Sequence, residues 1–342
     1  MKKKINILAL TTEPSTADKL FKKNYPSLIF LNKTFLREDK NKGMVDLKKN
    51  LKMENINIFT KKEIKKNIKI DYEMHFYSNI PQVTNAKLYL ILPEHYYVDK
   101  LCKKEILEKK YDKIFTNILN HVDNRKFFYI NWPLYPNHKK IIKKKSFFLC
   151  MIASNKTLTR YTKNSGYSER SKIINWFVKN KPGKLKVFGK GWDRPIFKNY
   201  FFSRLINFVF NKFNFRYNFL KADYMGVCNN KQKVLKNFKF AFAIENVVNE
   251  PGYNTGQIFD IMKASTIPIY LGRKDINKII PKNCFIHYNK FKNLEDLYIF
   301  INNMSHKKIN QYQKNIFNFC NKRFPNEFTE KNFRKTIVKQ IK

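Results

Sequence analysis

The sequence predicts an α/β protein of two domains, each built on a doubly wound parallel β-sheet. Three observations lead to this fold class. Short apolar runs alternate with helical stretches, which is the pattern of parallel strands joined by crossover helices. A turn-rich break at 131–138, followed by the basic run 139–145, separates two such series. Polar loops follow several expected strands, where open α/β sheets bind ligands, so we expect two domains with a cleft between them.

The first series covers 1–145. Its apolar runs predict strands at 5–10, 28–31, 55–59, 68–70, 86–92, 113–115 and 127–130. The run at 86–92 has the strongest pattern, and those at 55–59 and 68–70 are the weakest. A helix is expected at 98–110. This order predicts one parallel sheet for the first domain.

The second series covers 146–304. Strands are expected at 146–155, 185–188, 240–244 and 267–271. Helices are expected at 167–179, 259–264 and 294–303, and the first of them carries apolar residues at helical spacing. From 305 to 342 the chain is expected to be helical and strongly basic, as a C-terminal tail.

Composition excludes several classes of protein. Of 342 residues, 43% are hydrophobic and 16% aromatic, which is enough to build cores and excludes a disordered chain. No apolar run approaches the roughly 18 residues of a membrane-spanning helix, and 5–10 is predicted as a strand rather than part of a signal peptide. Five cysteines lie far apart without a CxxC pair. We therefore expect free thiols, no zinc site and a cytoplasmic location.

The net charge of +43, from 69 basic and 26 acidic residues, first suggests a nucleic-acid partner. The excess is mostly lysine, however, and is spread over the whole chain. No helix-turn-helix, zinc finger or RNP-type motif is present, so we expect no nucleic acid. Two interpretations stay open. One is a solvated lysine surface, and the other is contact with an anionic membrane, to which lysines are attracted at roughly 1 kcal/mol each.

The densest polar motif follows the expected strand at 240–244. Glu245 and Asn246 come directly after the strand, and Tyr253, Asn254 and Thr255 precede the next helix. Polar groups at a strand end, with free amides at a helix start, suit the hydroxyls and diphosphate of a sugar nucleotide. The alternative is a structural loop with an Asn-Thr helix cap.

This motif resembles that of the α1,3/α1,4-fucosyltransferases, glycosyltransferase family 10. The family pattern is an apolar strand, Glu-Asn, a loop, Tyr-x-Thr-Glu-Lys, a helix and Pro-[Ile/Val]-x-x-Gly. Here it runs from Glu245-Asn246 to Pro268-Ile269-Tyr270-Leu271-Gly272. Other family-like pieces follow the same order: Asp112–Thr116, Ser154-Asn155, Ser168-Glu169-Arg170 and Gly189-Lys190-Gly191-Trp192. The resemblance is firm over 146–290, looser over 86–136 and weak before that.

The resemblance implies a GT-B architecture of two Rossmann-like domains facing a cleft. The acceptor-side domain would be 1–145, the nucleotide-sugar donor domain 146–304, and the basic helical tail 305–342. It also implies an inverting fucosyltransferase that moves fucose from GDP-fucose to a hydroxyl of an oligosaccharide acceptor. A cell-surface glycan such as lipopolysaccharide and an α1,3-type linkage are expected. No cofactor beyond the donor is required and no metal site is expected, because no Asp-x-Asp pair follows the expected strands.

By match to the family, Arg170 should hold the diphosphate, because a guanidinium bonds two oxygens and neutralises the leaving group. The expected donor-binding residues are Asn155, Arg170, Lys190, Glu245, Asn246, Tyr253, Asn254, Thr255 and Gln257. One departure concerns the family's Glu-Lys, which is Gly256-Gln257 here. It leaves open another nucleotide sugar as donor, or a non-catalytic glycan- or nucleotide-binding relative. Candidate substitute cations are Lys263, Arg273 and Lys274.

An inverting transfer needs a base that takes the proton of the acceptor hydroxyl. The family uses a carboxylate that follows a first-domain strand like 86–92. Glu94 is therefore the expected base, and His95 is the alternative, since its unperturbed pKa suits the task. Tyr96, Tyr97, Trp132 and Tyr135 are candidates for stacking on acceptor sugars.

The tail has two interpretations. The stretch 305–324 is expected to pack back across the domains. The stretch 328–341 could lie on an anionic inner leaflet, with Phe333, Ile337 and Ile341 inserted and its lysines attracted to lipid headgroups. The second interpretation predicts a peripheral position at the inner membrane face. It also predicts that soluble activity survives truncation after Pro325.

Overall fold

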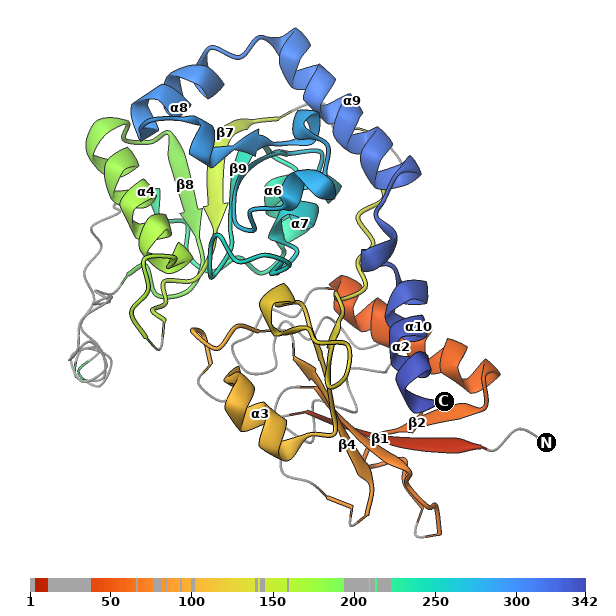
Figure 1. Cartoon of the computed structure of the whole chain (residues 1–342). Coiled ribbons are helices and arrows are strands. Elements are labelled where there is room, and N and C mark those ends of the chain that lie inside the picture. The colour runs from red at the N-terminus through yellow and green to blue at the C-terminus, as the bar shows by residue number, and fades with distance from the viewer. Residues whose placement is uncertain are drawn as a thin grey trace. The chain divides into compact units, whose positions relative to one another are not determined.

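The chain folds into two compact units (Figure 1). The computed structural model describes residues 4–11, 38–65, 67–76, 82–83, 85–92, 94–99, 102–138, 141, 145–158, 160–193, 209, 213 and 223–342. The first unit comprises 1–96, 100–135 and 325–342, and the second comprises 97–99 and 136–324. The expected tail 305–342 is thus divided, because its last 18 residues belong to the first unit.

The first unit is built on a six-stranded parallel sheet with the strand order β2-β1-β3-β4-β5-β6. Its strands are β1 (Ile5–Thr11), β2 (Ile56–Phe59), β3 (Tyr72–Phe76), β4 (Lys87–Leu92), β5 (Lys113–Thr116) and β6 (Phe127–Tyr129). Every adjacent pair is parallel. Their carboxyl ends therefore lie at one edge, where the loops that follow β4, β5 and β6 begin.

Helices cover both faces of this sheet. The helices α2 (Glu38–Met53) and α10 (Glu330–Ile341) lie side by side and pack with Tyr89 and Ile91 of β4 (Figure 1). The shorter α3 (Lys104–Lys110) packs with Leu90 and Leu92. Successive residues of β4 thus pack into the two cores on opposite faces of the sheet, because side chains alternate along a strand.

The apolar face of α10 is part of the first unit's core. Phe333, Ile337 and Ile341 are buried beside residues of α2 and of the sheet. Strand side chains also bind the end of the helix. The Tyr89 hydroxyl donates to the Gln340 carbonyl over 2.7 Å, and Lys113 Nζ donates to Gln340 Oε1 over 2.7 Å. The hypothesis that these three apolar residues insert into a membrane is therefore wrong, because they are already buried in protein.

The second unit contains a five-stranded parallel sheet with the order β11-β10-β9-β7-β8. Its strands are β7 (Phe147–Ile152), β8 (Leu185–Phe188), β9 (Phe238–Ile244), β10 (Ile267–Leu271) and β11 (Ile286–His287). Its helices are α4 (Gly166–Asn180), α6 (Lys231–Leu235), α7 (Gln257–Lys263), α8 (Leu294–Asn302) and α9 (His306–Lys322). The central strand β9 is almost fully buried from end to end, as a strand covered on both faces should be.

Most of the expected strands are present, with three differences. The run 68–70 is not a strand, and β3 follows it instead. The predicted helix at 98–110 is confined to α3. Neither α2 nor the two-residue β11 was expected. The run 28–31 lies outside the described residues.

Within the described ranges, no helix is both long and apolar enough to cross a membrane. No group of three or more His, Cys, Asp or Glu side chains in the same residues is arranged to hold a metal ion. All five cysteines are buried free thiols.

A half-buried lysine joins the ends of two helices in the second unit. Lys145 precedes β7, and its Nζ donates to the carbonyls of Lys236 (3.0 Å) and Ala264 (2.8 Å) and to the Thr266 hydroxyl (3.2 Å). Lys236 and Ala264 are the C-cap residues of α6 and α7, where carbonyls lack helical partners. Burial lowers the pKa of Lys145 to about 7.

This pKa predicts a pH-dependent stability. The unfolded chain keeps Lys145 protonated up to its ordinary pKa of 10.5, so it binds more protons than the folded chain above pH 7. The free energy of unfolding should therefore rise with pH between about 7 and 10, by up to about 1.4 kcal/mol per pH unit from this group. Urea unfolding of the wild type and of Lys145→Met at several pH values isolates the effect. Lys233→Met, at an exposed side chain of α6, is the control, and equal slopes in all three proteins would contradict the assignment.

Candidate functional site

The polar loops of the second unit gather at the carboxyl edge of its sheet. The central one is the β9–α7 loop, residues 245–256. Its neighbours are the segment after β7, the turn after β8 and the loop after β10, since β7, β9 and β10 are adjacent parallel strands. Backbone hydrogen bonds join the β9–α7 loop to both sides. Val248 N–H donates to the Asn164 carbonyl, and Asn249 N–H donates to the Gly272 carbonyl, each over 2.9 Å.

Glu245 closes the β9–α7 loop on itself. Its side chain is buried at the end of β9, and Oε2 accepts hydrogen bonds from the Thr255 N–H (3.0 Å) and the Thr255 hydroxyl. Gly272 lies against it. A Cβ at Gly272 would be 2.5 Å from Glu245 Cγ and 2.2 Å from the Tyr270 hydroxyl oxygen, so only glycine fits there.

Arg170 lies beneath the start of this loop. Ser165 caps α4 by accepting from Ser168 N–H, and the helix presents Arg170 to the end of β9. The buried guanidinium donates to the Ile244 carbonyl and to Asn246 Oδ1 (3.1 Å). A Cβ at Gly166 would come within 1.8 Å of the Glu245 carbonyl oxygen, so α4 and the loop approach as closely as glycine permits.

The remaining residues of the motif form the second half of the loop. Tyr253 and Asn254 are buried, and Asn254 Oδ1 accepts from the Gly256 N–H. Gly256 has φ of +78°, a left-handed conformation, and Gln257 begins α7 half-buried. The family's glutamate position is therefore a backbone conformation that favours glycine here.

Asn155 and Lys190 belong to a neighbouring cluster at the ends of β7 and β8. Asn155 Nδ2 donates to the Gly191 carbonyl, and its N–H donates to the Lys190 carbonyl, each over 2.9 Å. The Trp192 indole donates to the Ala153 carbonyl over 2.7 Å. These bonds fix the turn after β8 against the end of β7. The Lys190 side chain is exposed.

The structure thus pairs Arg170 with Asn246 and Glu245 with Thr255, and Asn254 lies beside Thr255 in the same loop. Of the candidate substitute cations, Lys274 is exposed, Lys263 is half-buried, and Arg273 is buried in a pair with Asp275. Sequence reasoning missed the roles of Tyr270, Gly272 and Asp275. The Pro-x-x-x-Gly segment gave a signal for the first two, because it ends β10 beside Glu245.

The candidate base lies in the first unit. Glu94 follows β4 by two residues and is half-buried, and its Oε1 accepts from the His95 N–H over 3.0 Å. His95 has 0% of its surface exposed, and its ring packs against Tyr96 with centroids 4.4 Å apart. Of the two, only Glu94 therefore has access to solvent.

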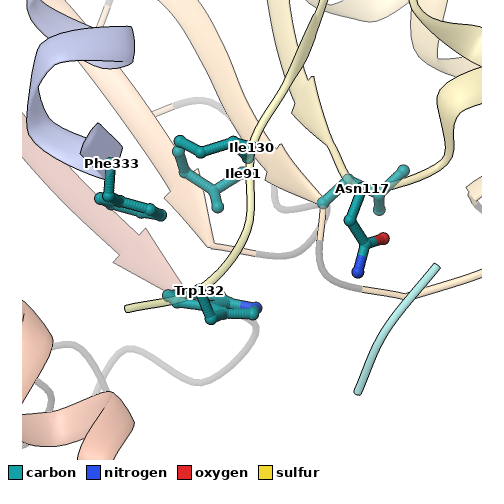
Figure 2. Close-up of a pocket in the computed structure, with 6 residues that line it drawn as sticks. Ile91, Asn117, Ile130, Trp132 and Phe333 are labelled. Carbon is teal, nitrogen blue, oxygen red and sulfur yellow. The ribbon is translucent and has the colours of Figure 1, made fainter. Parts of the chain in front are cut away.

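A narrow pocket is lined in part by Ile91 and Leu92, which shortly precede Glu94 in the sequence. Figure 2 shows its lining from the ends of β4, β5 and β6 and from α10: Ile91, Leu92, Asn117, Ile130, Trp132 and Phe333. The Trp132 ring is half-buried and stacks with Phe76, at a centroid distance of 6.0 Å, and with Phe333, at 5.7 Å. These contacts fix the orientation of the ring, and its stacking on an acceptor sugar stays a prediction.

Comparisons with known proteins concern the fold and part of the sequence. A family model described as glycosyltransferase family 10 (fucosyltransferase) C-term matches residues 211–335. No curated protein sequence matches the chain. Among solved structures, an α1,3-fucosyltransferase with GDP-fucose has a TM-score of 0.54 at 15% identity, over 99% of this chain and 91% of its own. HepE of Anabaena, in complex with UDP and glucose, has a TM-score of 0.52 at 10% identity, over 98% and 99%. The expected class of two Rossmann-like domains, the GT-B fold, is confirmed.

Proposed function

We propose that this chain, whose residues 211–335 match the C-terminal model of glycosyltransferase family 10, is a glycosyltransferase that transfers fucose from GDP-fucose to an oligosaccharide acceptor. One observation carries the proposal. Glu245, Asn246 and Thr255, which match the family's motif, lie on one loop at the carboxyl edge of the second unit's sheet, where Thr255 binds Glu245 and Asn246 binds Arg170. That edge is where open α/β sheets bind nucleotides.

We assign the donor to the second unit and the acceptor to the first. In the reaction, an acceptor hydroxyl oxygen forms a bond to the anomeric carbon of fucose, and the bond from that carbon to the diphosphate oxygen breaks. Glu94 takes the hydroxyl proton, and GDP leaves with the bonding electron pair. The carbon inverts, because attack and departure occur on opposite faces. A cell-surface glycan such as lipopolysaccharide, joined by an α1,3 linkage, is the acceptor that we propose.

Arg170 supplies the positive charge beneath the loop. Arg170→Ala should lower transfer by about two to three orders of magnitude, as loss of one preorganised charge does. Arg170→Lys should fall between, since an ammonium keeps the charge but not the fork that serves Ile244 and Asn246. Initial rates and melting temperatures should be measured together. Lys172→Ala, on the exposed face of α4, is the control, and normal turnover in Arg170→Ala would remove the role.

Gln257, in place of the family's lysine, favours a second candidate, in which the same site takes another nucleotide sugar. Restoring both family residues is a poor test, because glutamate at the left-handed Gly256 would cost roughly 1–2 kcal/mol of backbone strain. Gln257→Lys alone avoids this strain. It should tighten GDP-fucose if that is the donor, and should weaken the true donor if the site is retuned.

The test is calorimetric titration of the full chain with GDP-fucose, GDP-mannose and UDP-glucose, followed by assays of donor hydrolysis and transfer. We expect binding and slow hydrolysis of GDP-fucose. If the protein prefers a UDP-sugar, that sugar nucleotide is the donor and GDP-fucose is not. Binding without hydrolysis or transfer to any glycan tested would favour the non-catalytic relative.

We further propose that the protein works in the cytoplasm, at the inner membrane face. With the apolar side of α10 buried, the contact would be electrostatic. Lys331, Lys335 and Lys339 form an exposed row along α10, suited to anionic headgroups. Binding to anionic but not neutral vesicles, lost in high salt and in the triple glutamine variant, is the expected result. Equal binding by that variant would place the contact elsewhere.

A further inference from the structure

The loop after β10 carries an ion pair, between buried Arg273 and half-buried Asp275, that the sequence motif does not include. Arg273 Nε donates to Asp275 Oδ1 over 2.7 Å, and an Nη donates to Asp275 Oδ2 over 2.5 Å. Only 4% of Arg273 is exposed. This two-point geometry fixes the carboxylate in the plane of the guanidinium. Hydrogen bonding from Arg273 also holds the pKa of Asp275 below its ordinary value.

The same carboxylate reaches the β9–α7 loop. The Gly252 N–H donates to Asp275 Oδ1 over 3.4 Å, a long bond that an ionised acceptor strengthens. Nearby, the Arg273 N–H donates to the Tyr270 hydroxyl over 3.0 Å. That hydroxyl flanks Gly272 together with Glu245. Asp275 therefore contacts the loop at its middle, Arg273 holds that carboxylate, and the backbone of Arg273 binds Tyr270 near the start of the loop.

The β9–α7 loop needs support from outside because its own backbone is unfavourable. Asn249, Gly252 and Gly256 all have left-handed φ values, of 62°, 79° and 78°. For the non-glycine among them such a conformation is strained, and for the glycines it is one of many that a free loop would sample. A loop with these turns keeps one shape only when neighbouring groups hold it.

We propose that Arg273 and Asp275 are positioning residues, which hold the β9–α7 loop in the shape that binds the donor nucleotide. The proposal rests on the function inferred above for this loop. A loop already held in its bound conformation loses less conformational freedom when the ligand arrives, so binding is tighter. Neither side chain has to touch the donor.

The competing role is that Arg273 itself binds the diphosphate, in place of the family's missing lysine. The geometry favours positioning, because a carboxylate already neutralises the guanidinium and engages it at two points. The two roles predict opposite effects of Asp275→Asn. Removal of the negative charge loosens a positioned loop, but it frees a guanidinium that would bind phosphate.

The experiment combines GDP titration with hydrogen exchange on the full chain. Asp275→Asn should raise the Kd for GDP about tenfold and speed exchange of the amides at 249–256 about tenfold, with little change in the exchange of β9. Arg273→Lys keeps the charge but not the fork, so it should give smaller shifts in the same direction. Lys278→Ala is the matched control, since its exposed side chain lies in the same loop three residues after Asp275, and both readings should match the wild type.

Unchanged loop exchange in Asp275→Asn would overturn the proposal. Tighter GDP binding in that variant would overturn it in favour of Arg273 as the phosphate ligand. If Asp275→Asn has a much lower melting temperature than the wild type, the Kd for GDP and the loop exchange of Arg273→Lys decide between the two roles. If the wild type binds no GDP while loop exchange still responds as expected, the positioning role stands and the proposed donor is wrong.

Discussion

Truncation after Pro325 is expected to unfold the first unit rather than to remove a dispensable tail. The deletion takes Phe333, Ile337 and Ile341 out of a core that also contains α2 and β4. Loss of one large buried apolar side chain costs about 2–5 kcal/mol. Three such losses approach or exceed the roughly 5–15 kcal/mol by which a domain is stable. The earlier expectation that soluble activity survives this truncation is therefore replaced by loss of activity.

The measurement is thermal unfolding of the truncated and intact chains, with limited proteolysis to identify which unit is cleaved. Two full-length variants separate the effect of lost core packing from the effect of lost charge on α10. Ile337→Ala, in the core, should lower the melting temperature, whereas Lys335→Gln, on the exposed face of α10, should leave it nearly unchanged. A truncated protein whose residues 4–135 resist protease as well as the intact chain would contradict the prediction.

Glu94→Gln is expected to lower acceptor-dependent transfer by about 10²- to 10⁴-fold, the usual contribution of a general base. The amide keeps the shape of the side chain and its bond from the His95 N–H, but it cannot take a proton. Donor affinity should not change, because the proposed donor residues all belong to the second unit. Initial rates at saturating donor, together with GDP titration, test both statements.

His95→Ala is the informative comparison. His95 is fully buried against Tyr96, so its loss should lower the melting temperature more than the rate at low temperature. An active Glu94→Gln with an inactive but folded His95→Ala would move the base to the neighbouring residue. A Glu94→Gln protein that binds GDP poorly would mean that Glu94 serves the donor instead.

Strands were predictable where apolar residues run together. The runs at 86–92 and 267–271 correspond to β4 and β10 nearly residue for residue. The strand β3 was missed because it contains Glu73 and His75. These two polar side chains are buried because they are hydrogen-bonded. His75 Nε2 lies 2.9 Å from Glu73 Oε2, and His75 Nδ1 is bonded to the Tyr111 hydroxyl. Such pairing depends on neighbours that only the fold supplies. For α2 the signal was present, because Met44, Leu47 and Leu51 have helical spacing and are all buried.

The candidate site was predictable as a set of residues but not as a set of contacts. The Glu245 bond to Thr255 joins the two ends of one motif, and sequence alone places both of them on a loop. The pair Arg273–Asp275 is linked to the β9–α7 loop by the Gly252 N–H, which lies 23 positions away from Asp275 in the sequence. The apolar face of α10 shows a different limit. An amphipathic helix satisfies the same hydrophobic requirement on lipid or on protein, so the pattern alone cannot choose.

The return of α10 to the first unit has a consequence for the order of events during synthesis. The second unit is almost continuous, over 136–324, so it can fold as soon as that stretch has left the ribosome. The first unit emerges earlier but lacks the helix that fills its core. Some 190 residues separate 135 from 325, which at about 5–20 residues per second is a wait of roughly 10–40 s. During that interval Met44, Leu47 and Leu51 have no helix to pack against, so the amino-terminal unit is the one that a chaperone would have to protect.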